Sequence, residues 1–184
     1  CKNKQIIYFA QMIDKKKFYI NGEWIDAKGK ESIKVIDPST EKSCAEISLG
    51  NKDDVNNAVI AAKKAYESWG FSSKEERIKL LENLYVLYKK RWADIASAIT
   101  MEMGAPKDFA TKLQAGTGAS HIKSFIRYLK EFEFEKPLGE HAPDQRIIYE
   151  PKGVCALITS LELADESSLF KGNSSVVSRL HNGS

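Results

Sequence analysis

Residues 147–159 read IIYEPKGVCALIT, and this stretch decides the predicted fold class. It holds two apolar runs, residues 147–149 and residues 154–158, on either side of a Pro-Lys-Gly bend. The second run has no polar alternation, which is typical of a strand covered on both faces in a parallel sheet. Such a strand would end at Ile158 and Thr159, and open α/β sheets bind their ligands at that end.

The N-terminal part of the chain predicts two pairs of small antiparallel strands. An Asn-Gly pair at positions 21 and 22 stands between two extended runs, and both residues tolerate the positive φ of a tight hairpin turn. A second pair of extended runs, residues 32–36 and 44–49, flanks an Asp-Pro-Ser-Thr sequence that suits a type I turn. We expect these strands to pack on a layer of helices.

The first predicted helix begins at a capping box. Asn51 is the cap, Asp54 stands three residues later, and the helix ends near Trp69. Apolar residues at helical spacing predict its core-facing side. They are Val55, Val59, Ala62 and Tyr66.

Ser73 and Glu76 form a second capping box, which begins the longest predicted helix, and Gly104 ends it. A third helix is expected over residues 107–128. Its small residues 116–120 follow no strand and lack Gly-Lys-Ser/Thr, so they predict a close helix contact or a bend rather than a phosphate loop. The core stripe of the longest helix recurs at spacings of three and four. It comprises Ile78, Leu81, Leu84, Tyr85, Tyr88, Trp92, Ile95 and Ile99.

Residues 131–135 alternate between Glu and Phe, which predicts a half-buried strand. A loop containing Pro and Gly leads from it to another extended run at residues 146–150. The apolar face of the alternating strand needs a partner.

The composition is that of a globular protein, with 42% hydrophobic and 29% charged residues among 184. A net charge of +3 without a recognition motif argues against a nucleic-acid partner. No apolar run approaches the roughly 20 residues that span a bilayer, so we expect no membrane partner. Cys1, Cys44 and Cys155 are too few for a disulfide framework or a zinc site, which indicates a reducing compartment and a cytoplasmic location.

Several stretches resemble one family, in the same order along the chain. They are YINGEW at residues 19–24 with VIDPST at 35–40, EMGAP at 102–106, and YEPKGVCALIT at 149–159. Together they resemble the N-terminal portion of NAD(P)-dependent aldehyde dehydrogenases over residues 17–159. The resemblance ends at Ser160, where the family continues with Pro-Trp-Asn.

The resemblance implies an α/β fold in which N-terminal helices and small antiparallel strands lead into the first strand of an incomplete Rossmann-like parallel sheet. The family oxidises aldehydes: a cysteine thiolate adds to the aldehyde, a hydride passes to NAD or NADP, and a glutamate activates water. Only Ile158 and Thr159 carry over to the cofactor site. No catalytic or metal-binding residue carries over. The helix around residues 107–118 is implied to contribute to the wall of the aldehyde tunnel.

The family's reactive groups are missing after residue 159. Ser160 and Leu161 stand where the oxyanion-binding Asn motif would begin, and neither the adenosine-binding Lys-Pro-Ser-Glu nor the catalytic cysteine's motif follows. Glu162 lies in a run similar to the family's glutamate motif, but Gly-Gly-Lys does not follow it, so we interpret it as a coincidence or a deletion scar. Cys155 is expected in mid-strand, where burial raises the pKa of its thiol and leaves it inert.

These observations divide the chain into five predicted regions. They are an N-terminal extension (1–16), a scaffold of helices and strands (17–130), protruding oligomerisation strands (131–150), the first strand of a truncated nucleotide-binding domain (151–160), and a divergent tail expected to be disordered (161–184).

Two classes of function stay open. The first is an N-terminal fragment of an aldehyde dehydrogenase, inactive alone, whose parent enzyme takes an aldehyde and forms a homo-oligomer. The alternative is a non-catalytic helical module that binds a partner through an exposed strand at residues 132–134 or 147–149. A lipid-modified Cys1 would instead make a surface lipoprotein. The sequence decides neither the aldehyde nor between NAD and NADP.

Overall fold

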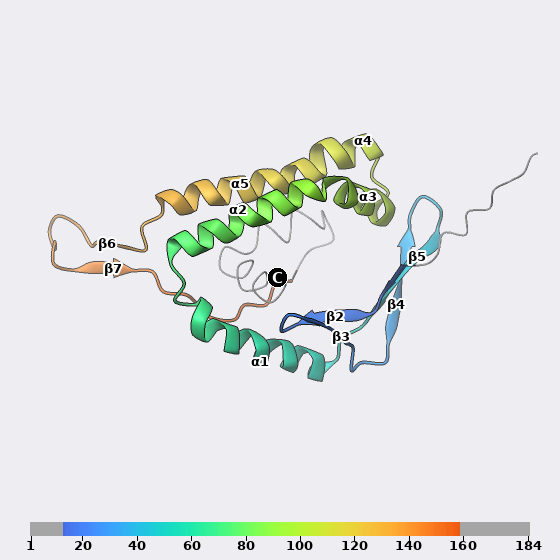
Figure 1. Cartoon of the computed structure of the whole chain (residues 1–184), viewed down its shortest axis with the longest axis horizontal. Coiled ribbons are helices and arrows are strands. Elements are labelled where there is room, and N and C mark those ends of the chain that lie inside the picture. The colour runs from blue at the N-terminus through green and yellow to red at the C-terminus, as the bar shows by residue number, and fades with distance from the viewer. Residues whose placement is uncertain (1–12, 159–184) are drawn as a thin grey trace, which may run out of the picture.

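The structure, a computed structural model, describes residues 13–158. Two long helices, α2 (Lys74–Lys90) and α5 (Ala115–Glu131), lie side by side, and α1 (Lys52–Trp69) runs across from them (Figure 1). Small sheets lie at both ends of this helical layer, and the hairpin nearest the C-terminal end of the described chain projects away from it (Figure 1). The protein is therefore a mixed α/β structure in which helices form the core.

The first hairpin is confirmed. β2 (Lys17–Ile20) pairs with β3 (Glu23–Asp26) in antiparallel register around Asn21 and Gly22, whose φ angles are 55° and 82°. Positive φ at both central residues is the geometry of a type I′ turn, which matches the twist of the strands. The turn chemistry of the Asn-Gly pair fixes this register.

The second strand pair is also confirmed, but it belongs to a larger sheet. β4 (Ser32–Asp37) and β5 (Lys42–Ser48) are antiparallel, and the predicted turn joins them. β1 (Ile13–Lys15) adds to β5 in parallel, which gives the strand order β1-β5-β4. The sequence reading did not predict β1, because three residues carry no periodic signal.

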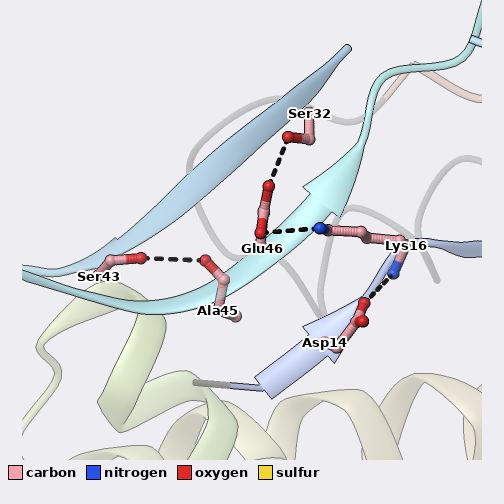
Figure 2. A network of polar contacts seen from close by, with 6 residues as sticks. All are labelled: Asp14, Lys16, Ser32, Ser43, Ala45 and Glu46. Carbon is pink, nitrogen blue, oxygen red and sulfur yellow. Dashed lines mark hydrogen bonds and ion pairs between the residues drawn. The ribbon is translucent and has the colours of Figure 1, made fainter. Parts of the chain in front are cut away.

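A charged network ties the three strands of this sheet together (Figure 2). The Glu46 carboxylate on β5 accepts a hydrogen bond from the Ser32 hydroxyl on β4 (2.5 Å) and lies 3.0 Å from the Lys16 ammonium. These contacts lower the pKa of Glu46, the Ser32 hydroxyl most strongly, and raise the pKa of Lys16. The network holds the short β1 segment against β5.

α1 begins at the predicted capping box. The Asn51 side chain accepts from the N–H groups of Asp53 and Asp54, and the Asp54 carboxylate accepts from Asn51 N–H at 3.0 Å. The same carboxylate accepts from the N–H groups of Lys28 (2.9 Å) and Gly29 (3.1 Å) in the loop before β4. Asp54 is buried, and these three hydrogen bonds lower its pKa, that of Asn51 most strongly. It therefore joins the start of α1 to a loop 25 residues earlier.

One of the four residues predicted to face the core from α1 is exposed instead. Val59, Ala62 and Tyr66 are half-buried, but Val55 is 59% exposed. The first turn of α1 is held by Asp54, and nothing among the described residues covers the adjoining Val55 side. The capping contact, rather than apolar packing, fixes this end of the helix.

The prediction of one long helix ending at Gly104 is wrong at Arg91. α2 begins at its confirmed capping box and ends at Lys90, and α3 (Trp92–Met103) starts after a residue with φ −99° and ψ 14°. The apolar stripe continues across this break, so the periodicity of the sequence did not predict the break. The break lets α2 pack on α5 while α3 contacts the segment before α5.

The third helix is confirmed and has three parts. α4 (Lys107–Phe109) leads into a π-helical turn, η1 (Ala110–Gln114), and then into α5, which runs three residues beyond its predicted end. Ala115, Gly118 and Ala119 are buried, so small residues let α5 approach its neighbours closely, as expected. Ile122, Ala119 and Tyr88 form the centre of the core.

The predicted strand over residues 131–135 is wrong. Glu131 ends α5, and the strand β6 covers only Glu135–Pro137, paired with β7 (Arg146–Ile148). The Lys74 ammonium donates to the carbonyls of Lys130 and Phe132, which extends the helix end at the expense of the strand. This short pair is the hairpin that projects in Figure 1.

The strand predicted over residues 154–158 does not form. Residues 149–158 have no regular secondary structure, so the described chain contains no Rossmann-like parallel sheet. A strand of a Rossmann-like sheet pairs with parallel neighbours and is covered by helices, and no strand within residues 13–158 pairs with residues 154–158. The α/β part of the fold-class prediction holds, but its parallel sheet is not confirmed.

We expect Asp54→Asn to lower the thermal unfolding midpoint at pH 7, because a neutral amide cannot replace a carboxylate that accepts three N–H groups. The folded-state pKa of Asp54 is lowered, so its stabilisation is complete above the unfolded-state pKa of about 3.9. It is lost as the pH falls through the lower folded-state pKa.

Circular dichroism melts at pH 7 and pH 3 measure this effect, and the gap between wild type and variant should shrink at pH 3. Asp53→Asn, in the same turn of α1 but exposed, is the matched control. Equal midpoints for the two variants at pH 7 would contradict the anchoring role of Asp54.

Candidate functional site

The two cofactor residues predicted from the sequence lie at the end of the described chain. Ile158 is 81% exposed, and Thr159 lies outside residues 13–158. The segment that leads to them is held at its start, where the Tyr66 hydroxyl of α1 donates to the Pro151 carbonyl at 3.2 Å. The structure places Ile158 in solvent and does not test its predicted contact with a cofactor.

The expectation for Cys155 is wrong. Its side chain is exposed, because the strand that was to bury it does not form. Cys44 is half-buried and its thiol donates to the Val35 carbonyl at 3.4 Å, which is typical of a structural thiol. Cys1 and Glu162 lie outside the described residues.

The small residues at positions 116–120 do not form a phosphate loop. Gly116 and Gly118 lie inside α5, so their N–H groups belong to the helix and are not presented to a phosphate. Between residues 13 and 158 there is also no group of three His, Cys, Asp or Glu side chains that could hold a metal ion. No helix in this range is long and apolar enough to cross a membrane.

The carboxylates with lowered pKa values serve the fold. Glu46, Asp54 and Glu76 accept hydrogen bonds in the sheet and at two helix starts, and Asp37 accepts from Ser39 in a turn, with the Ser39 hydroxyl the largest cause. Glu76 owes its lowered pKa chiefly to the N–H of Ser73. A general base needs a raised or nearly neutral pKa, so none of these four groups is a candidate.

The π turn η1 combines an unusual backbone geometry with exposed apolar side chains. Ala115 N–H donates to Ala110 carbonyl, five residues back, instead of four. Phe109 and Leu113, four residues apart on one helix face, are 47% and 57% exposed. Ala110 and Ala115 on the inner side are fully buried. The turn thus fixes its inner side in the core and directs two large apolar side chains outward.

Two aromatic donors hold this turn from the core. The Trp92 indole N–H on α3 donates to the Thr111 carbonyl at 2.9 Å, and the buried Tyr88 hydroxyl on α2 donates to the Ala115 carbonyl at 3.0 Å. The sequence reading assigned both residues to apolar packing alone. The signal that it missed is that a buried Tyr or Trp needs an acceptor for its polar atom.

Gln114 is the polar residue that the π turn buries. Its side-chain oxygen has no hydrogen-bond partner among the described residues. Buried acceptors are normally paired. The Gln114 side-chain oxygen is therefore an acceptor for which residues 13–158 supply no donor.

The aldehyde dehydrogenase family model matches residues 24–163. A 3-succinoylsemialdehyde-pyridine dehydrogenase from a Pseudomonas species is 42% identical over 149 residues, which cover 80% of this chain and 30% of the relative. The chain therefore spans less than a third of the length of this relative.

Solved structures agree with this match. An aldehyde dehydrogenase from Bartonella henselae is 49% identical, with a TM-score of 0.69 over 70% of this chain and 27% of its own. A cysteine-to-alanine variant of aldehyde dehydrogenase C from Pseudomonas syringae, in complex with NAD+ and octanal, is 32% identical. Its TM-score is 0.82 over 89% of this chain and 33% of its own.

We expect Tyr88→Phe to lower the free energy of unfolding by about 1 kcal/mol, because the Ala115 carbonyl loses a buried donor while the ring is kept. Urea denaturation followed by circular dichroism measures the loss. Tyr128→Phe removes a hydroxyl from an exposed ring on α5 and should stay within about 0.5 kcal/mol of wild type. A Tyr88→Phe protein as stable as the control would show that the hydrogen bond does not contribute to the fold.

Proposed function

Because this chain belongs to the aldehyde dehydrogenase family, we propose that it is the N-terminal portion of an enzyme that oxidises aldehydes to carboxylic acids with NAD or NADP. The observation that carries the proposal is the family match over residues 24–163, which includes most of the described chain. The likeness to a structure that holds NAD+ and octanal supports both the cofactor class and the substrate class.

The role proposed for these residues is that of a scaffold. Residues 17–130 supply the helical layer and the sheets around it, and residues 151–160 lead into the nucleotide-binding part of the enzyme. Two thirds or more of each matched relative has no counterpart in this chain. Within the described residues, the Cys44 thiol donates to a carbonyl and the Cys155 side chain is exposed. The 184 residues alone therefore should not turn over aldehyde.

The projecting hairpin at residues 131–150 is proposed to pair subunits of the parent enzyme. Its exposed apolar side chains, Leu138 and Ile148, support this role, and so does its position outside the helical layer (Figure 1). We place the enzyme in the cytoplasm on the basis of its low cysteine content.

The outward face of the π turn is proposed to form part of the wall along which the aldehyde approaches. Phe109 and Leu113 are large, apolar and exposed there, which favours aldehydes with an apolar tail. Asp108 and Lys112 beside them form an ion pair at 3.1 Å, so their charges partly offset each other. This support is independent of the cofactor site.

A second candidate is the non-catalytic interaction module. The observation in its favour is that β7 is an edge strand whose outer side has no partner strand among residues 13–158, and Ile148 on it is 63% exposed. Size-exclusion chromatography with light scattering separates the two. A stable monodisperse monomer favours the module, and aggregation favours an incomplete enzyme.

The 184-residue chain should reduce neither NAD nor NADP in the presence of aldehydes, because its sequence lacks the motif around the family's catalytic cysteine. The absorbance of the reduced cofactor, followed with short, long and aromatic aldehydes, is the measurement. Reproducible turnover that persists after a second purification would overturn the prediction of inactivity.

A chimaera tests the scaffold role directly. Residues 13–158 replace the aligned segment of the Pseudomonas 3-succinoylsemialdehyde-pyridine dehydrogenase, which keeps its own remaining sequence. We expect the chimaera to oxidise aldehydes at a rate within about tenfold of the unmodified relative, since 42% identity preserves the core pattern. A folded, soluble chimaera without activity would show that this chain is not an equivalent scaffold.

A further inference from the structure

We propose that Tyr88 and Trp92 are positioning residues for aldehyde selection: they hold the π turn η1 and thereby fix where Phe109 and Leu113 stand. This inference rests on the proposed function, because it takes the outward face of the turn to lie along the path of the aldehyde. The new element is that the buried Tyr88 and the half-buried Trp92, which lie behind the turn, set the shape of that path.

The backbone of the turn explains why donors are needed. A π turn contains one residue more than an α turn, so its carbonyls no longer meet the N–H groups four residues on. Here Ala115 N–H bonds to Ala110 carbonyl, and Thr111 carbonyl receives the Trp92 indole N–H at 2.9 Å. A displaced buried carbonyl without a donor costs free energy, so the indole favours the π geometry over a regular α turn.

Tyr88 and Trp92 act as one unit. Their rings contact each other edge to face, with centroids 6.2 Å apart and planes at 84°. They lie on different helices, on either side of the break at Arg91. The indole ring also lies in van der Waals range of Gly116, where an added Cβ would meet it at 3.9 Å. The break in the helix therefore brings two donors to the two ends of the π turn.

The outward residues depend on this inner support. Ala110 and Ala115 are fully buried, so the inner side of the turn has no room to move independently of the aromatic pair. If the π turn reverted to an α turn, the helix face after the turn would rotate relative to the face before it. Leu113 would then lose its present position beside Phe109, and the apolar surface that receives the aldehyde tail would change.

The experiment uses the active chimaera with Trp92→Phe and Tyr88→Phe, which remove the donors and keep aromatic rings. We expect the KM for octanal to rise about three- to tenfold, the KM for acetaldehyde to stay unchanged, and kcat to stay within about twofold. A contact with the remote tail affects binding of the long aldehyde and leaves the reacting carbon untouched. Tyr128→Phe is the matched control and should leave both KM values unchanged.

Hydrogen exchange on the 184-residue chain supplies a second readout. The Ala115 amide should exchange at least about tenfold faster in both donor variants than in Tyr128→Phe, since the bond to Ala110 depends on the π geometry.

The outcomes are distinguishable. An equal loss with both aldehydes, an unchanged octanal KM, or an unchanged Ala115 exchange rate would overturn the positioning role while the proposed function stands. A parent chimaera without activity would overturn the proposed function, and the inference with it.

Discussion

The close packing of α5 on α2 is the constraint on which the rest of the structure depends. Small residues at the start of α5 bring its backbone against the aromatic side chains of the neighbouring helices, and Ile122 fills the centre of the contact. At that distance the Tyr88 hydroxyl has to find an acceptor inside the core, and it finds the Ala115 carbonyl. The position of the π turn follows from this contact, because the turn ends where α5 begins.

The same packing directs the chain at the other end of the helix pair. Lys74 at the start of α2 donates to the carbonyl of Lys130 in α5 and to that of Phe132 just after α5, and Arg77 lies over the Phe134 ring at 5.5 Å. These contacts set where the projecting hairpin leaves the helical layer. The returning strand β7 then leads to Pro151, which α1 holds through Tyr66. One helix pair thus orients both the hairpin proposed for subunit pairing and the segment proposed to enter the nucleotide-binding part.

Features that depend on neighbouring residues could be predicted from the sequence, and features that depend on tertiary contacts could not. The Asn-Gly turn and both capping boxes were predictable because each depends on residues within three positions of one another. The break at Arg91, the π turn and the end of α5 at Glu131 depend on contacts from other helices, so no periodic pattern revealed them. The strand expected over residues 154–158 has the composition of a buried parallel strand, but residues 13–158 give it no partner strand. The candidate site was predicted only at Ile158 and Thr159, at the end of that expected strand, and the donors at the π turn were interpreted as packing.

We propose that these residues form a scaffold whose geometry serves chemistry carried elsewhere in the enzyme. Isothermal titration calorimetry of the 184-residue chain with NAD tests this most directly, because a scaffold without a phosphate cradle has no means to bind the dinucleotide tightly. We expect no heat of binding at micromolar protein, as the scaffold role requires. Stoichiometric uptake of NAD with a dissociation constant in the micromolar range or below would contradict it.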